Sequence, residues 1–336
     1  MSVSGPQRIT LIGLGTIGMS MAGLHLSRVN TIVDVFDTRP NFEDYLFKTL
    51  PNFLPKSSPS SEDASFESTQ STSVPSLISS GRLHIHKSLE TACASATIVQ
   101  EQGPENLAFK QEIWAQVESF APPTAHFWTS TSGIAASAQQ STMQDKTRLL
   151  VVHPFNPPHI MPLLEIVPSP TTAPERVDFA RGYFSQPGSR HRPVVIRKEI
   201  PGFVGNRLAF ALLREACYLV QEDVVTAKDL DTILMASLGP RWAGNGVFES
   251  YQQGGGEGGI EAFLHKLGGT MQEVWDGLGQ VNVLGEEGTA WKSKVIAQTN
   301  EAYGEFSPGQ MREKEERLRD FVHVQTKKYG HGEPEV

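Results

Sequence analysis

A histidine and a carboxylate stand twelve residues apart in the segment VVHPFNPPHIMPLLEIV, residues 151–167. His153 follows an apolar run, Glu165 lies inside a second apolar run, and the four prolines between them exclude a helix. We expect two extended segments joined by a rigid turn, which brings the imidazole within hydrogen-bond distance of the carboxylate. A carboxylate buried alone costs several kcal/mol, so it needs a partner. Such a pair can move a proton, because the carboxylate stabilises the imidazolium that forms.

A glycine-rich turn near the N-terminus is the second feature with chemical meaning. It comprises residues 13–18, GLGTIG, between an apolar strand at residues 9–12 and a segment suited to a helix up to about residue 27. A second strand at residues 31–36 ends in Asp37. In this context G-x-G-x-x-G predicts a dinucleotide site, because glycines let backbone N–H groups approach a pyrophosphate at the helix N-terminus. The alternative is a glycine-rich turn without a ligand.

The expected cofactor contacts are Gly13, Gly15, Thr16, Ile17, Gly18 and Asp37. Asp37 would accept hydrogen bonds from the adenosine ribose and repel a 2′-phosphate, which favours NAD. Arg39, two residues further on, leaves room for NADP. No metal site is expected, because Cys93 and Cys217 do not form a pair with metal-ligand spacing. We interpret them as reduced core cysteines.

The elements around these residues alternate between strands and helices. Further strands are predicted at residues 83–85, 96–100, 125–128, 149–152 and 194–196. The residues Pro104-Glu105-Asn106 open an amphipathic helix. This pattern predicts an α/β fold, a Rossmann-type doubly wound sheet. Because ligands bind outside the carboxyl ends of parallel strands, we expect the glycine-rich turn, the serine-rich turn at residues 129–133 and His153 to lie along one edge.

The character of the chain becomes helical at residue 201, so an all-α C-terminal domain should follow the sheet. We predict domains at residues 1–199 and 200–336, the second for substrate binding and dimerisation. In the second domain, helices are expected at residues 201–220, 226–239, 260–267, 271–278 and 311–328, with a glycine-rich loop at 252–259. A mobile serine- and proline-rich segment is predicted at about residues 51–81, because its composition cannot bury enough apolar surface.

Charge and hydropathy restrict the partners. A formal net charge of -8 and a pI near 5.7 provide no basic surface for nucleic acid or anionic lipid. No apolar run approaches the roughly 18 residues that span a bilayer, and the N-terminus has no apolar signal region. We therefore expect a cytoplasmic protein with no nucleic acid and no membrane partner.

Several motifs together resemble the 3-hydroxyacyl-CoA dehydrogenase superfamily, most closely its lambda-crystallin or L-gulonate 3-dehydrogenase branch. They are IGLGTIG, QEQGPENLAFKQEIWAQV, TSTSG, HPFNPP followed by PLLEIVP, PGFVGNRL and LGPRWAGNGVFE. The resemblance covers nearly the whole chain. It implies hydride transfer between NAD and a secondary alcohol at the carbon β to a carboxyl group, and a homodimer formed through the helical C-terminal half.

The resemblance also implies roles for individual residues. His153 matches the catalytic base, Glu165 its orienting carboxylate, Ser132 a hydroxyl near the substrate oxygen, and Asn206 an amide that holds substrate and cofactor; Glu105 and Lys110 match positions near the nicotinamide ribose. Alternatives remain for three of these roles. His153, which precedes a proline, could be a satisfied turn histidine, Ser130 competes with Ser132, and Asn206 could only cap backbone groups. We interpret His159 as a surface turn residue.

The substrate is expected to be a small free acid. Arg241 lies where the lambda-crystallin branch has an arginine, and its guanidinium could clamp a carboxylate; the alternative is a structural salt bridge at a helix end. Residues 57–81, which are serine-rich and mildly acidic, have no cation for the phosphates of coenzyme A. We predict oxidation of the 3-hydroxyl of a polar 3-hydroxy acid of the L-gulonate type to the keto acid. The alternatives are a 3-hydroxyacyl-CoA dehydrogenase or reductase acting on a thioester, and a non-catalytic crystallin-like NAD-binding protein.

Overall fold

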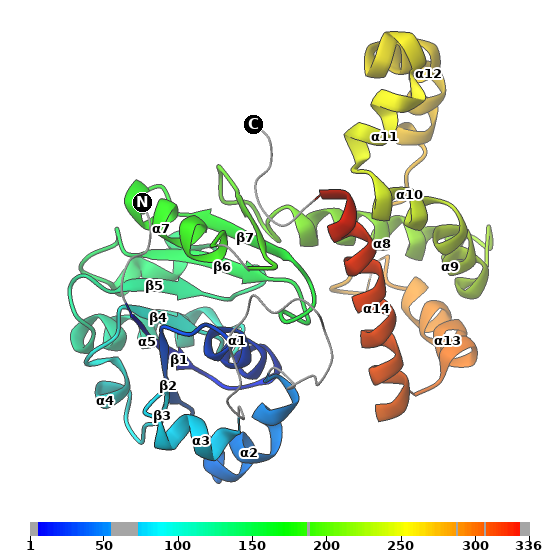
Figure 1. Cartoon of the computed structure of the whole chain (residues 1–336). Helices are drawn as coiled ribbons and strands as arrows, with labels where there is room; N and C mark the ends of the chain where they lie inside the picture. Colours follow the sequence, from blue (N-terminus) through cyan, green and yellow to red (C-terminus); the bar gives the residue numbers. More distant parts are fainter. Residues whose placement is uncertain (1–5, 55–72, 187–188, 287, 306, 330–336) are drawn as a thin grey trace. The chain divides into compact units, whose positions relative to one another are not determined.

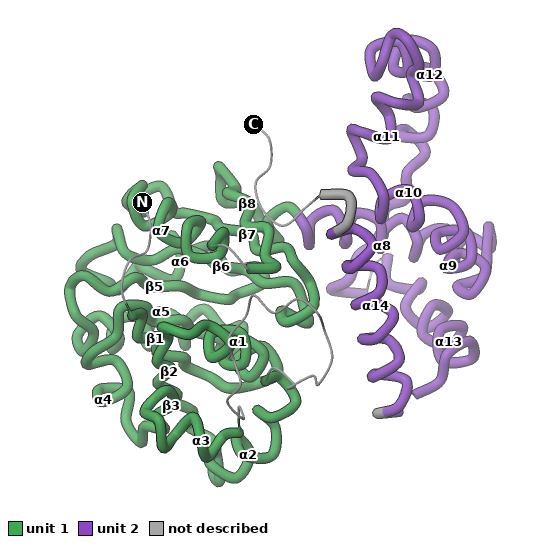
Figure 2. Tube along the Cα trace, in the orientation of Figure 1, with its two compact units in different colours: residues 1–204, 331–336 green, residues 205–330 purple. Residues whose placement is uncertain are grey.

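The computed structural model describes residues 6–54, 73–186, 189–286, 288–305 and 307–329 (Figure 1). The chain divides into two compact units, the first up to Val204 and the second from Gly205 to Gly330 (Figure 2). Most of the predicted mobile segment, residues 55–72, lies outside the described residues. Its flanks are ordered as a 3-10 turn at Leu50–Asn52 and the helix α3 at Val74–Ser79.

The described residues of the first unit form an eight-stranded sheet with the order β3-β2-β1-β4-β5-β6-β7-β8. The strands are β1 (Gln7–Ile12), β2 (Thr31–Phe36), β3 (Leu83–Ile85), β4 (Ile98–Glu101), β5 (His126–Thr129), β6 (Leu149–Pro154), β7 (Leu163–Pro168) and β8 (Arg192–Val195). Strands β1 to β6 are parallel, in the order typical of dinucleotide-binding folds, and β7 is antiparallel to β6. The predicted fold class is confirmed.

Helices cover both faces of this sheet. The remaining helices of the unit are α1 (Thr16–Leu26), α2 (Phe42–Thr49), α4 (Leu89–Cys93), α5 (Leu107–Phe120), α6 (Ala136–Gln139) and α7 (Pro174–Phe184). One core packs the sheet against α1, α2, α3 and α7, and the other packs it against α4, α5 and α6. Neighbouring residues of one strand enter different cores, as Phe127 and Trp128 do. Burial on both faces explains why these strands are almost continuously apolar.

The described residues of the second unit are helical and contain no strand. The helices are α8 (Gly205–Gln221), α9 (Ala227–Ala236), α10 (Leu238–Gly244), α11 (Val247–Gly254), α12 (Gly259–Asp276), α13 (Trp291–Tyr303) and α14 (Pro308–Tyr329). Helix α8 begins later than predicted, because Gly202 and Phe203 have φ of 73° and 49°. The hydroxyl of Thr226 caps α9 by accepting from the Asp229 N–H.

Three predictions for the second unit are wrong. The expected glycine-rich loop at residues 252–259 is largely the end of α11 and a 3-10 turn at Gly256–Gly258. The two helices expected at 260–267 and 271–278 are the single helix α12, because Gly268 and Gly269 do not interrupt it. Helices α10 and α13 were missed. In the part of the chain that the structure describes, no helix is both long enough and apolar enough to cross a bilayer.

Candidate functional site

The His153–Glu165 pair is formed by the β6–β7 hairpin, whose antiparallel register places the two residues opposite each other. His153 Nδ1 lies 2.8 Å from Glu165 Oε2, and the two side chains are only 6% and 2% exposed. The other carboxylate oxygen accepts the backbone N–H of Val204 at 2.9 Å. Because Glu165 holds a proton on Nδ1, the basic nitrogen of the neutral ring is Nε2. The geometry is that of a general base with a fixed tautomer.

The loop after β6 is tied to helix α1 by His159. Its Nδ1 lies 3.0 Å from Ser20 Oγ, which also accepts the backbone N–H of His159. The ring packs edge-on against Phe53 at 5.1 Å. His159 lies in a turn, as predicted, but its imidazole is half-buried and anchors the loop to a helix 139 residues away in sequence.

The glycine-rich turn has the shape that a pyrophosphate needs. Gly13 has a φ of 84°, and a Cβ on Gly18 would lie 2.2 Å from the Gly13 oxygen, so side chains are excluded at both positions. A Cβ on Gly15 would meet nothing within 4 Å, and no side chain among the described residues caps the start of α1. Thr16 and Ile17 form the first turn of that helix. The open backbone at Gly15 therefore fits an anionic pyrophosphate at the N-terminus of α1.

Asp37, at the end of β2, is joined to this turn and to Arg39. Its Oδ2 accepts the Leu14 N–H at 2.7 Å, and its Oδ1 accepts the Arg39 N–H at 2.9 Å. The guanidinium of Arg39 contacts both carboxylate oxygens at 3.2 Å and lies 4.1 Å from the centroid of the Tyr45 ring. Arg39 thus offsets the negative charge that would repel a 2′-phosphate.

Replacing Arg39 by methionine is expected to weaken NADPH binding at least about tenfold, the equivalent of about 1.4 kcal/mol, while NADH binding changes less. The reason is that Asp37 would then repel a 2′-phosphate without compensation. Fluorescence titrations with both reduced cofactors measure the ratio of the two dissociation constants, and Lys48→Met on α2 serves as a control for the loss of one surface cation. An unchanged ratio in the Arg39 variant would show that this arginine plays no part in cofactor choice.

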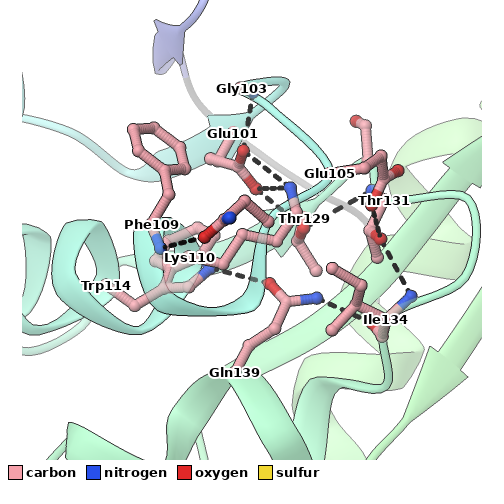
Figure 3. A network of polar contacts seen from close by, with 12 residues as sticks. Glu101, Gly103, Glu105, Phe109, Lys110, Trp114, Thr129, Thr131, Ile134 and Gln139 are labelled. Atoms are coloured by element: carbon pink, nitrogen blue, oxygen red, sulfur yellow. Dashed lines mark hydrogen bonds and ion pairs between the residues drawn. The ribbon is translucent and has the colours of Figure 1, made fainter.

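Polar contacts link the loop after β4 to the turn after β5 (Figure 3). Glu105 accepts hydrogen bonds from the Thr131 hydroxyl at 2.6 Å and from the Ser132 N–H and hydroxyl at 2.6 and 2.9 Å. Partial burial raises the pKa of the Glu105 carboxyl, but these hydrogen bonds outweigh it and lower the pKa below its usual value. The structure therefore brings together Glu105 and Ser132 at the carboxyl edge that also carries His153.

Beneath this contact lies an ion pair that sequence reasoning missed. The Lys110 ammonium lies 2.8 Å from each oxygen of Glu101, and both side chains are almost fully buried. The charge of Lys110, which the resemblance places near the nicotinamide ribose, is thus balanced by a protein carboxylate. The only sequence signal for Glu101 is an acid at the carboxyl end of a buried strand.

The two remaining predicted site residues belong to the second unit. Asn206 lies in the first turn of α8. Arg241 was expected at the end of a helix after residue 239, but α9 ends at Ala236 and Arg241 lies in the last turn of the separate short helix α10. It is exposed and forms no ion pair with any other described residue.

The class that this fold defines is a dinucleotide-binding α/β protein with a helical C-terminal unit. The chain belongs to the 3-hydroxyacyl-CoA dehydrogenase family: residues 8–200 match its NAD binding domain and residues 202–290 match its C-terminal domain. The predicted family and the predicted NAD cofactor are confirmed.

Relatives named as dehydrogenases align with much of the chain. The L-carnitine dehydrogenase of Streptomyces coelicolor is 32% identical over 269 residues, 80% of this chain and 80% of that protein. The 3-hydroxyacyl-CoA dehydrogenase of Gibberella moniliformis is 35% identical over 77% of this chain and 76% of its own length. The L-carnitine dehydrogenase of Mesorhizobium japonicum is 38% identical over 62% of this chain, but the match spans only 57% of that relative.

A solved structure resembles the chain over 97% of its length. It is that of 5-formyl-3-hydroxy-2-methylpyridine 4-carboxylic acid 5-dehydrogenase, described as an NAD+ dependent dismutase, with a TM-score of 0.73, 25% identity and 99% of its own chain covered. None of these names points to the L-gulonate or lambda-crystallin branch, which therefore stays a prediction.

Proposed function

We propose that the chain is an NAD-dependent dehydrogenase that oxidises the 3-hydroxyl of a small polar 3-hydroxy acid to the 3-keto acid. The observation that carries the proposal is the buried His153–Glu165 pair at 2.8 Å, at the carboxyl edge of a sheet whose first turn fits a dinucleotide. The relatives named L-carnitine dehydrogenase support a substrate of this size and polarity. Acids of the L-carnitine and L-gulonate type are the substrates to test.

The proton leaves the substrate hydroxyl for Nε2 of His153. Glu165 keeps the Nδ1 proton in place and stabilises the imidazolium by its charge, and the Val204 N–H keeps the carboxylate oriented. A bound NAD would supply the hydride acceptor for the carbon that carries this hydroxyl. Gly13, Gly15 and Gly18 would hold its pyrophosphate and Asp37 its adenosine ribose. In the direction of reduction, the same imidazolium returns the proton to the keto oxygen.

Three further residues are assigned to the substrate. Ser132, whose hydroxyl donates to Glu105 at 2.9 Å, is the hydroxyl near the substrate oxygen. Asn206 supplies an amide to substrate and cofactor. Arg241 clamps the free carboxylate, because a forked guanidinium matches a carboxylate bidentately and this one has no described ion-pair partner.

A substrate panel tests this proposal. The rate of NADH formation, followed by its ultraviolet absorbance, is measured with L-carnitine, L-gulonate, 3-hydroxybutyrate and 3-hydroxybutyryl-CoA. A higher kcat/KM for one of the free acids than for the CoA thioester supports the proposal. Turnover of the thioester alone supports the second candidate, a 3-hydroxyacyl-CoA dehydrogenase, which the Gibberella moniliformis relative favours by its name. Binding of NADH without turnover of any of the four would support a non-catalytic protein.

The second unit is proposed to form a homodimer. Of the described residues of α8, only Cys217 and Val220 are buried, whereas Leu208, Phe210 and Leu213 are each more than half exposed. Apolar surface of this extent on a helix is typical of a protein interface. We assign a second copy of the chain to this apolar surface of α8, in line with the predicted dimerisation role of the second unit.

Replacing Phe210 by glutamate is expected to shift the protein from dimer to monomer, because a carboxylate would be buried without a partner in the interface. Sedimentation velocity over a concentration series measures the dissociation constant, which should rise at least about 100-fold, roughly the scale of an interface hot spot. Val29→Glu, at an exposed position of the first unit, provides the matched control. A wild-type protein that sediments as a monomer would contradict the proposed dimer.

A further inference from the structure

The strongest feature outside the proposed reaction chemistry is the buried carboxylate of Glu101, at the end of β4. We propose that Glu101, paired with Lys110, is a positioning residue that holds the loop at residues 102–106 in the shape required for NAD binding. This inference rests on the proposed function of Glu105 as a cofactor contact. Glu101 itself would touch neither cofactor nor substrate.

Glu101 joins three elements at one point. Its Oε1 accepts the Gly103 N–H at 2.6 Å and its Oε2 accepts the Thr129 hydroxyl at 2.8 Å, while Lys110 on α5 contacts both oxygens. The side chain is completely buried, so water does not compete for these hydrogen bonds. The carboxylate therefore ties the loop after β4 to the end of β5 and to helix α5 (Figure 3).

The second carboxylate of this region acts at the outer end of the same loop. Glu105 holds Thr131 and Ser132, and the Thr131 hydroxyl in turn accepts the Ile134 N–H at 3.0 Å. Two carboxylates, one buried and one exposed, thus connect the loop after β4 to the turn after β5. Loss of the inner connection would leave Glu105 as the remaining carboxylate link between the loop and the turn.

The loop also borders the glycine-rich turn. A Cβ on Gly13 would lie 3.0 Å from the Gly103 nitrogen, and a Cβ on Gly103 would lie 2.4 Å from the Phe109 ring. Gly103 is therefore enclosed between the pyrophosphate turn and helix α5. Because the Gly103 backbone packs against Gly13, a change in the position of Gly103 would alter its contact with the pyrophosphate turn.

The Glu101–Lys110 ion pair contributes more to the geometry of the loop at residues 102–106 than to the stability of the fold. The cost of removing two charges from water offsets most of their attraction, and replacement of a buried pair by apolar residues is often neutral for stability. Removal of one partner alone leaves an unpaired charge and destabilises the fold. The double variant Glu101→Leu/Lys110→Met therefore separates the two roles, because it avoids an unpaired charge but deletes the acceptor of the Gly103 N–H.

The test is made on the full chain without substrate. In the cofactor-free double variant, amide hydrogen exchange in residues 102–106 should be at least about tenfold faster than in the wild type, and the dissociation constant for NADH at least about tenfold higher. The melting temperature should stay similar. The control Arg8→Met/Asp34→Leu removes another ion pair of the first unit, joined at 2.6 Å, in which the aspartate is buried and the arginine side chain is 33% exposed. It should leave both the loop exchange and NADH affinity unchanged.

The possible outcomes separate the alternatives. Weaker NADH binding with unchanged loop exchange would show that Lys110 acts by direct contact, which overturns the positioning role. Faster exchange with unchanged NADH affinity would show that the loop shape does not matter for the cofactor, and it overturns the proposal as well. If the double variant does not fold, Thr129→Val removes one donor to Glu101 without changing charge and must show the same two effects, though smaller. None of these measurements depends on which acid the wild type oxidises.

Discussion

Replacing His153 by glutamine is expected to lower kcat by about 10² to 10⁴-fold, the scale of a removed general base, while NADH affinity stays nearly intact. Glutamine keeps a polar side chain of similar length, but its amide cannot accept the substrate proton. Because the Glu165 carboxylate would then lie against an amide, the melting temperature should be compared as well. Steady-state turnover with the best acid of the panel, and fluorescence titration with NADH, measure the two quantities.

His159→Gln is the matched comparison for this experiment. His159 is bound to Ser20 and has no assigned role in proton transfer, so its variant should retain most of the turnover. Equal losses in the two variants would point to a general effect on the loop after β6. Full turnover in the His153 variant would eliminate the proposed base.

Replacing Gly15 by valine is expected to raise the dissociation constant for NADH at least about 100-fold without loss of folding. The backbone at Gly15 has a φ of -69°, which any residue adopts, and a Cβ there meets no atom of the protein within 4 Å. The branched side chain would instead occupy the space in which backbone N–H groups approach a pyrophosphate, where close contact depends on the absence of a side chain. Calorimetry or fluorescence titration measures the affinity, and thermal unfolding measures the fold.

Two further glycine substitutions serve as a comparison and a control for the Gly15 variant. Gly18→Ala should lower the melting temperature, because its Cβ would lie 2.2 Å from the Gly13 oxygen. Gly268→Val, inside α12 at a position with open space around the Cβ, controls for the general effect of valine in place of glycine. NADH affinity of the wild-type value in a folded Gly15 variant would place the pyrophosphate elsewhere.

Local signals in the sequence were sufficient for the sheet. Apolar runs bounded by turn residues predicted its strands, because strands buried on both faces need continuous apolar sequence. The same reasoning failed in the second unit, where glycines 268 and 269 were interpreted as a break. A glycine weakens a helix by only about 1 kcal/mol, which the surrounding contacts of α12 can offset.

The His153–Glu165 pair could be inferred from sequence because both residues belong to one hairpin. Prolines fixed the extended path, and two apolar strands joined by a turn favour antiparallel pairing. The glycine-rich turn was also recognisable, since strand, turn, helix and acid follow each other within residues 9–37. These are contacts between neighbours in the chain.

Only the tertiary structure revealed the contacts between distant segments. Lys110 pairs with Glu101, and His159 binds Ser20, because separate strands and helices meet in the folded sheet. Local sequence patterns do not predict which of these distant side chains come into contact. Their partners depend on how the strands and helices pack and on the need to pair every buried polar group. Sequence alone thus determined the family, the glycine-rich turn and the His153–Glu165 pair, whereas the fold decided the contacts by which Glu101 joins the loop after β4 to β5 and α5.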